Sequence, residues 1–324
     1  MRAALFLSAL LVTLPLHADP TATTIIHNLG GTPGAPLVGT GNTFDILPGN
    51  GQLINNTNLF HSFQQFDLKA GDTADFHSGG ATNIIARVNG GIPSNIFGNL
   101  VSDANLFFIN PSGVFFGPNA TINVTGAFTV STANFVRLSD GGIFYADLGG
   151  SDHLTSAPVS AFGFTSPTPG AITFSGSQLS NTHGIHVIGG DLSFTSAQLL
   201  AAGSNLTLFS ATSAGEVPFS LASPGTGFAT ATTTAFGNIT ATGSHLGIDG
   251  STGGGSVVIR GGRLVADNST ITSLNSGSAA GGNISVHVDS LAMQNLARIG
   301  ATAASTRASG SVKGGVVEHR RSRL

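Results

Sequence analysis

The chain lacks cysteine altogether, and its 324 residues include no tryptophan and one tyrosine. Without cysteine there is no disulfide framework, no thiolate zinc site and no cysteine nucleophile. Charged side chains make up only 8% of the residues, against about 25% in an average soluble domain. This scarcity excludes a coiled coil, a salt-bridged helical bundle and a charge-rich disordered tail. A formal net charge of −3 also leaves no overall positive field for binding nucleic acid.

The abundant residues favour many short strands joined by tight turns. Glycine occurs 46 times and phenylalanine 22 times, alongside frequent serine, threonine, asparagine, valine and isoleucine. β-branched and aromatic side chains suit strands, whereas glycine and asparagine suit turns. The composition therefore predicts an all-β protein.

The N-terminus predicts a secretory signal peptide over residues 1–18. Arg2 supplies a positive charge, the run from Ala3 to Leu14 is apolar, and Ala18 offers a small residue for cleavage. A membrane anchor is the alternative, but this run is shorter than the ~20 residues that span a bilayer. We therefore expect export of the chain that follows Ala18.

Alternating and apolar runs predict the strands. From Thr121 to Ser131 the apolar residues Ile122, Val124, Phe128 and Val130 alternate with polar ones, which predicts one strand with two unlike faces. The apolar runs 106–109 and 114–116 are typical of strands buried on both faces. Further short strands are expected at 171–174, 185–188, 206–209, 257–259 and 284–288.

A weak internal repeat indicates stacked coils. Residues 264–268 align with residues 291–295 at an offset of 27 (291 − 264), and an earlier copy lies at 187–192. Repeats of roughly 20–50 residues are typical of solenoids, in which stacked neighbours form the core. For this reason we favour strand over helix for 289–299. An antiparallel β-sandwich is the alternative, but it needs more regularly spaced two-residue turns than the chain contains.

Three blocks of sequence stand out between residues 61 and 120. The first, His61–Leu68, is centred on Phe63, Gln64, Gln65 and Phe66. The second, Asn83–Val88, begins with Asn83, Ile84 and Ile85. The third, Ala104–Ala120, is centred on Asn110, Pro111, Ser112, Gly113 and Val114.

The third block predicts a firm turn between two buried strands. Pro111 fixes its own φ and pushes Asn110 toward extended backbone. The Asn110 side chain is suited to an Asx turn, and Gly113 supplies a backbone angle that a β-carbon disfavours. The turn either only builds the corner of a coil or also organises the surface on which a transporter acts, and the two roles are compatible.

The three blocks resemble the secretion domain of filamentous-haemagglutinin-type two-partner secretion exoproteins, over residues 24–136. The first block resembles the family's Phe-Gln-Gln-Phe strand, and the second resembles the strand that follows it. The third resembles the Asn-Pro-Asn-Gly-Ile signature, which here reads Asn-Pro-Ser-Gly-Val. The companion Asn-Pro-Asn-Leu motif of some members is absent from this sequence.

The resemblance implies a right-handed parallel β-helix with an N-terminal cap and an exported, adhesin-like exoprotein. Such proteins reach the periplasm through the Sec machinery and are recognised there by an outer-membrane barrel with POTRA domains. They cross it unfolded and fold outside, at the cell surface or secreted, where a glycan or host-surface ligand is expected. For the POTRA contact we expect strand addition, or β-augmentation, at residues 63–68 and 84–88.

The resemblance, together with changes in composition along the chain, gives a domain plan. The cap is expected at 21–53, within a two-partner secretion domain at 19–157. A loop or boundary at 158–170 then begins the passenger coils, 158–310. The tail 311–324 concentrates Lys313, Arg320, Arg321 and Arg323, which indicates either a basic surface-binding segment or a truncated or frame-shifted end.

A carbohydrate-active parallel β-helix enzyme, a lyase or hydrolase, is the alternative function. Such chemistry needs clustered carboxylates, yet the chain has only two glutamates, Glu216 and Glu318. Asp72 and Asp75 form the closest acidic pair, in an expected turn, and His183 with His186 lacks a third metal ligand. We therefore predict no catalytic residue, no metal and no cofactor.

Overall fold

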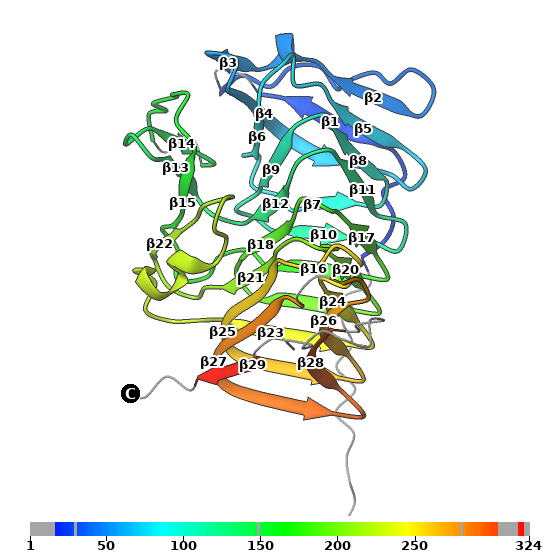
Figure 1. The fold of residues 1–324 in the computed structure, drawn as a ribbon. Helices are drawn as coiled ribbons and strands as arrows, with labels where there is room; N and C mark the ends of the chain where they lie inside the picture. The colour runs from blue at the N-terminus through cyan, green and yellow to red at the C-terminus, as the bar shows by residue number, and fades with distance from the viewer. Residues whose placement is uncertain (1–16, 29–30, 148–149, 279–280, 304–316, 321–324) are drawn as a thin grey trace, which may run out of the picture.

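The computed structural model describes residues 17–28, 31–147, 150–278, 281–303 and 317–320. These residues form a parallel β-helix with a smaller antiparallel sheet on one flank (Figure 1). The predicted all-β solenoid is therefore confirmed, and the β-sandwich alternative is wrong, because the coil strands pair in parallel with the strands of the next coil. Within the described residues, no helix is long and apolar enough to cross a membrane.

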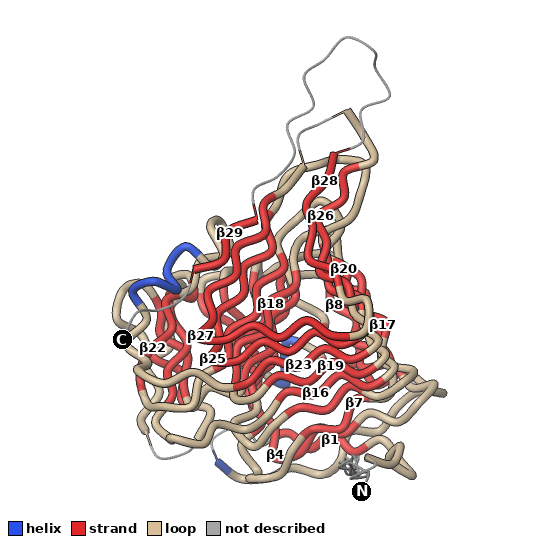
Figure 2. Tube along the Cα trace, turned by 90° about the horizontal axis from the view of Figure 1, so that it is seen from below, coloured by secondary structure: helices blue, strands red, loops and turns tan. Residues whose placement is uncertain are grey.

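The coils have three faces, and Figure 2 shows their strands stacked. The first face comprises β4 (Asn58–Asp67), β6 (Asn83–Val88), β9 (Asn105–Ile109), β12 (Phe128–Ser131), β18 (Ile185–Gly189), β21 (Leu206–Ser210) and the first halves of β25 (Ser256–Asp267) and β27 (Asn283–Gln294). The second face comprises β7 (Ser94–Ile96), β10 (Val114–Phe116), β16 (Ile172–Ser175), β19 (Leu192–Thr195), β23 (Asn238–Thr242) and the second halves of β25 and β27. The third face comprises β2 (Thr43–Ile46), β5 (Thr73–Phe76), β8 (Asn99–Ser102), β11 (Thr121–Val124), β17 (Gln178–Ser180), β20 (Gln198–Leu200), β24 (His245–Gly247), β26 (Thr270–Asn275) and β28 (Arg298–Ala303).

The interior of the coils forms one continuous core. Parallel in-register pairing places equivalent side chains of successive coils directly above one another, about 4.8 Å apart. Phe116, Phe174 and Phe194 occupy one such position. Their rings stack with centroid distances of 4.8 and 5.1 Å and interplanar angles below ten degrees. Stacked phenylalanines therefore fill part of the coil interior.

One corner of the coils repeatedly uses a left-handed backbone conformation. The residue that follows the second face has a positive φ in five successive coils. These residues are Gly176, Ser196, Gly243, Asn268 and Asn295, with φ between 45° and 66°. Glycine and asparagine are the residues that adopt this left-handed conformation at least cost. The predicted repeat is the same feature, because Leu264 pairs in register with Leu291.

Two insertions leave the coils and pack together outside the first face. Residues 132–171 contain β13 (Phe135–Leu138), β14 (Ile143–Tyr145) and β15 (Val159–Phe164). Residues 211–237 contain β22 (Gly215–Pro218) and a 3-10 helix, η3 (Thr226–Thr230). The four strands form an antiparallel sheet in the order β14-β13-β15-β22, here called the flanking sheet. It stands beside the coils in Figure 1.

The flanking sheet and the outward side chains of the first face enclose a second core. Phe60, Ile85 and Phe107 lie in register on successive strands of that face and pack in this core with Phe162 and Phe219. The middle strands of the first face are therefore buried on both sides.

Three sequence predictions need correction. The expected single strand 121–131 breaks at 125–127 into β11 and β12, which lie on different faces, so Thr129 and Ser131 are buried rather than outward and polar. The expected loop 158–170 contains β15, because β13 and β22 pair with it. The expected strand 289–299 is split between β27 and β28 by a corner at Asn295.

The N-terminal end of the coils is covered by antiparallel strands. β1 (Thr24–His27) and β3 (Gln52–Ile54) both pair with β4, and a 3-10 helix, η2 (Pro48–Asn50), precedes β3. The outer edge of β1 is itself closed, since Leu37 N donates to Ile25 O at 2.7 Å. The expected N-terminal cap is thus present.

The predicted domain boundaries stay predictions. The boundary at 157 falls between β14 and β15, inside the flanking sheet. Of the predicted signal peptide only residues 17 and 18 are described, and of the predicted tail only β29 (Val317–Arg320), which pairs in parallel with β27. Both interpretations otherwise lie outside the described residues.

Candidate functional site

The Asn110–Val114 turn joins β9 to β10 and is built as the sequence predicts. Asn110 is buried, and its Oδ1 accepts a hydrogen bond from Ser112 N at 2.9 Å, which closes the Asx turn. Its Nδ2 donates to Ile92 O and to Ser94 Oγ, both at 3.0 Å. The side chain therefore ties the turn to the preceding coil.

The following coil holds the same turn from the other side. Pro111 O accepts from Gly170 N at 3.2 Å, and Val114 N donates to Ala171 O at 3.1 Å. Gly113 has a φ of +119°, and a β-carbon there would lie 3.1 Å from the Ala171 carbonyl oxygen. The signature thus acts as a corner that connects three successive coils.

The Phe63–Phe66 block lies on β4, where the cap strand β1 pairs with it. Phe63 faces His27 and Gln65 faces Ile26, so Gln64 is the extra residue of a β-bulge. The bulge lets both phenylalanines point into the core, where their rings meet edge to face at 5.2 Å. The two glutamines are only partly buried. Gln64 Oε1 accepts from Asn28 Nδ2 at 3.0 Å, and Gln65 Nε2 donates to Asp67 Oδ2 at 2.7 Å.

Asn83 belongs to an asparagine ladder along the first face. Asn83 Nδ2 donates to Asn58 Oδ1, and Asn105 Nδ2 donates to Asn83 Oδ1, both at 2.9 Å. Asn58 continues the ladder to the carbonyl oxygens of Thr155 and Ala157 in the insertion. Ile84 points into the coil core, and Ile85 points into the second core.

Arg87 has a structural role that no sequence motif predicts. Its side chain is 6% exposed and pairs with Asp152 at 2.8 Å. The guanidinium also donates to Ser62 Oγ and to the carbonyl oxygen of Tyr145, and it lies over the Phe144 ring. Arg87 therefore fastens the tip of the flanking sheet to the first coils. The sequence offers one signal for this role: Arg87 stands in the largely apolar segment 83–88. A charge that such a strand buries requires a partner.

The edges of both candidate recognition strands are occupied in the folded molecule. β4 pairs with β1 and β3 on one edge and with β6 on the other, and β6 pairs with β4 and β9. Strand addition needs a free edge. For β6 both edges are taken. Over residues 63–67 of β4, a partner strand would have to displace β1 from the edge that it covers, because β6 continues on the other edge only as far as Phe63.

Two buried histidines lie where the cap meets the first coil. His27 on β1 and His61 on β4 have ring centroids 6.3 Å apart. Their ring nitrogens are buried without side-chain partners. Burial, followed by the nearby His27, lowers the pKa of His61 to about 4, and burial also lowers the pKa of His27. Both rings are therefore neutral members of the core near neutral pH.

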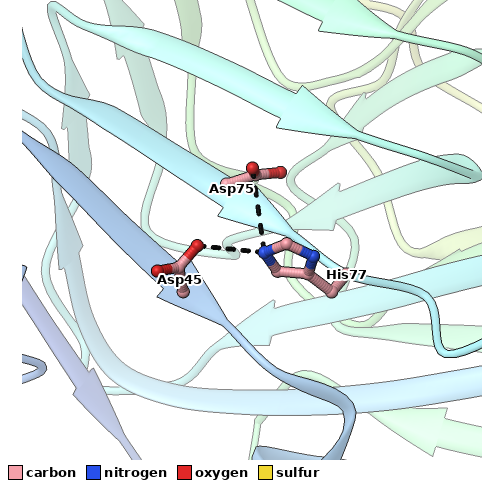
Figure 3. Close-up of side chains that lie close together, drawn as sticks. All are labelled: Asp45, Asp75 and His77. Atoms are coloured by element: carbon pink, nitrogen blue, oxygen red, sulfur yellow. Dashed lines mark hydrogen bonds and ion pairs between the residues drawn. The ribbon is translucent and has the colours of Figure 1, made fainter. Parts of the chain in front are cut away.

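Within the part of the chain that the structure describes, one group of three potential metal ligands comes together, on the third face (Figure 3). Asp45 and Asp75 face each other on β2 and β5, so Asp75 lies in a strand rather than in the expected turn. His77 Nε2 lies 3.0 Å from Asp45 Oδ1 and 3.7 Å from Asp75 Oδ2. The hydrogen bond to Asp45 raises the pKa of His77.

This cluster is open to solvent, with side chains between 30% and 46% exposed. Two like charges directly opposite each other on neighbouring strands repel, and the His77 ring nitrogen lies between the two carboxylates. His183 and His186 do not form a site together. His183 is exposed, whereas His186 is buried against Phe219 with its Nδ1 2.8 Å from Thr207 Oγ1.

Comparison with known proteins places these features in a wider context. A family model described as the TPS secretion domain matches residues 27–231. The HMW1 secretion domain from Haemophilus influenzae is a similar solved structure, with a TM-score of 0.48 and 18% identity over 92% of this chain and 81% of that one. The filamentous hemagglutinin secretion domain gives a TM-score of 0.43 and 14% identity over 93% and 99% of the two chains. No curated protein matches the chain.

Proposed function

The chain belongs to the TPS secretion domain family, and from this premise we propose that residues 63–68 and 84–88 are recognised by its outer-membrane transporter before the chain folds. The protein is a two-partner secretion exoprotein, and such proteins leave the cell through a dedicated outer-membrane partner. We further propose that the Sec machinery delivers it to the periplasm and that POTRA domains of the transporter bind it there.

The observation that supports recognition before folding is that the motif residues are buried and their strands are paired in the folded protein. Phe63, Phe66 and Ile84 are almost completely buried. β1 covers one edge of residues 63–67, and β6 has β4 and β9 on its two edges. In the unfolded chain the backbone groups of these segments are free to pair, which suits β-augmentation. Folding outside the cell then withdraws the segments from the transporter, so that folding and release are coupled.

The rest of the molecule supports an adhesin-like role after export. The coils present outward threonine and serine side chains, such as Thr173, Ser193 and Thr240, in register on the second face. These are suited to contacts with a glycan or a host surface. The carbohydrate-active enzyme finds less support, because the paired carboxylates Asp45 and Asp75 are already held by His77 on an open surface.

The test of the recognition proposal measures secretion and folding stability separately for the same variant. Gln64 and Gln65 contribute only one side-chain hydrogen bond each in the folded state, so replacing both with alanine costs the fold about 1–2 kcal/mol. With the transporter co-expressed, we expect this double variant to be secreted several-fold less than the parent, while its refolded form unfolds only a few degrees below the parent.

The matched control replaces Gln178 and Gln198, which lie on the third face in β17 and β20, with alanine. We expect unchanged secretion of this control. Equal secretion of both double variants would remove the proposal for residues 63–68. A synthetic peptide of residues 58–68 should bind purified POTRA domains, whereas the folded protein should not.

A further inference from the structure

A groove of about 500 Å³ opens on the first face beyond the second core. Its floor is formed by outward side chains of β25 and β27, where Val258 pairs with Ser285 and Arg260 pairs with His287. Its wall is the segment Pro224–Ala229, which includes the start of η3. We call it the Arg260 groove. It lies on the same face as the recognition strands but several coils away from them.

Arg260 is a largely buried cation with little compensation. Its side chain is 16% exposed, and among the described side chains its ion-pair partner is Asp289, whose Oδ1 lies 3.9 Å away, beyond hydrogen-bond distance. Its Nη1 donates one hydrogen bond, to His287 O at 3.1 Å, and its guanidinium lies 3.5 Å from the centre of the Phe236 ring. Burial of the guanidinium lowers its pKa. A guanidinium has five N–H donors in a planar fork, which matches a carboxylate.

The groups around Arg260 add hydroxyl, imidazole and apolar surface. Ser285 Oγ lies 2.8 Å from His287 Nε2, and the Ser256 side chain also lines the floor. Phe228 and Val258 supply the apolar part. Ligand pockets that combine apolar walls with a few convergent polar groups fall in the range of roughly 300–1,000 Å³.

We propose that the Arg260 groove binds an acidic sugar, with the sugar carboxylate paired to the Arg260 guanidinium. The hydroxyl and imidazole groups of Ser285 and His287 then meet the sugar hydroxyls, and the apolar wall covers the C–H face of the ring. A uronic acid and a sialic acid share this chemistry. The proposal goes beyond export and does not depend on the transporter contact, because it uses residues of the later coils only.

The test uses the secreted, folded chain and titrates it with glucuronate, with N-acetylneuraminate and, as the neutral counterpart, with glucose, followed by calorimetry and ligand-observed NMR. We expect one or both acidic sugars to bind, glucose not to bind, and affinity to fall as salt increases. The stronger of the two acidic sugars identifies the class of ligand.

Variants locate the site. Arg260→Gln should weaken binding by about tenfold or more, because a charge-assisted pair is lost. Arg263→Gln removes the same charge from an exposed position on the same strand and should leave binding unchanged. If Arg260→Gln does not fold, Arg260→Lys takes its place. Lysine keeps the positive charge and an aliphatic chain beside Phe236 but lacks the planar guanidinium, so binding should be several-fold weaker. The proposal is overturned if neither acidic sugar binds the parent protein, if glucose binds equally well, or if Arg263→Gln has the larger effect.

Discussion

Asn110 and His61 are both buried polar side chains, but they affect stability in different ways. The Asn110 amide makes three hydrogen bonds that define a turn. The His61 ring makes none of good geometry, and the nearby backbone of Asn50 offsets only part of its burial. A satisfied buried amide stabilises one conformation, whereas a buried imidazole is tolerated only while it is neutral.

The buried histidines predict a loss of stability in acid. His61 has a pKa of about 4 when folded and 6.5 when unfolded, so between these values the unfolded state binds more protons and stability falls as the pH falls. The loss from His61 is about 2 kcal/mol between pH 7.5 and 5. His27 and His186, whose pKa values burial also lowers, add to it. Urea unfolding at the two pH values measures the difference.

His61→Leu should remove the His61 share of this loss, because leucine does not titrate. The exposed His183 provides the control, and His183→Gln should leave the pH dependence as it is in the parent. If His61→Leu shows the same fall in stability between pH 7.5 and 5 as the parent, the buried cap histidine does not cause it.

At the scale of elements, the flanking sheet is attached to the coils through Arg87 and Asp152. Removing one member of a largely buried ion pair leaves the other without its partner. Because the Asp152 side chain is 26% exposed, we expect Asp152→Ala to cost about 2–3 kcal/mol. Hydrogen exchange should become faster in β13, β14 and β15 and remain almost unchanged in β24 and β26.

Asp147→Ala removes the same charge from the same insertion, at a residue without a side-chain hydrogen bond in the described part of the chain. It should change neither stability nor exchange by a measurable amount. Equal behaviour of the two variants would show that the Arg87 pair does not fasten the sheet.

The sequence predicts the individual coil strands better than it predicts the flanking sheet. The runs 106–109 and 114–116 are continuous and apolar because both of their faces are buried, and this is visible in the residues themselves. The pairing of β15 with β22 joins two insertions separated by whole coils, and no local pattern records such a contact. The insertions also lengthen two coils and so interrupt the regular spacing of the repeat.

The candidate site likewise combines features that the sequence predicts with contacts that it does not predict. The Asx turn at Asn110 follows from residue chemistry alone, since asparagine, proline and glycine each impose a local backbone preference. The partners of Arg87, and the approach of η3 to Arg260, depend on segments that are far apart in sequence. Asp152 lies 65 positions after Arg87, and sequence spacing gives no reason to connect them.

At the scale of the whole molecule, the first face lies between two cores. This predicts that its strands open locally less often than the strands of the third face. The strands β12, β18 and β21 are buried throughout, with the coil core on one side and the second core on the other. Local opening of these strands requires both cores to be exposed, whereas β26 and β28 have an outer side that faces solvent. We therefore expect amide exchange in β12, β18 and β21 to be at least about tenfold slower than in β26 and β28.

Phe162→Ala distinguishes this two-core arrangement from a single cooperative stack. Phe162 is fully buried in the second core, and its truncation costs about 3–5 kcal/mol. If the second core protects the first face from outside, amide hydrogen exchange should become faster in β13, β15, β12 and β18. The third-face strands β17, β20 and β24 should keep most of their protection. Mass-spectrometric exchange of the parent and the variant makes this comparison directly. A uniform acceleration over all three faces would instead mean that the coils and the flanking sheet open together, because then no part of the helix retains its protection when the second core is weakened.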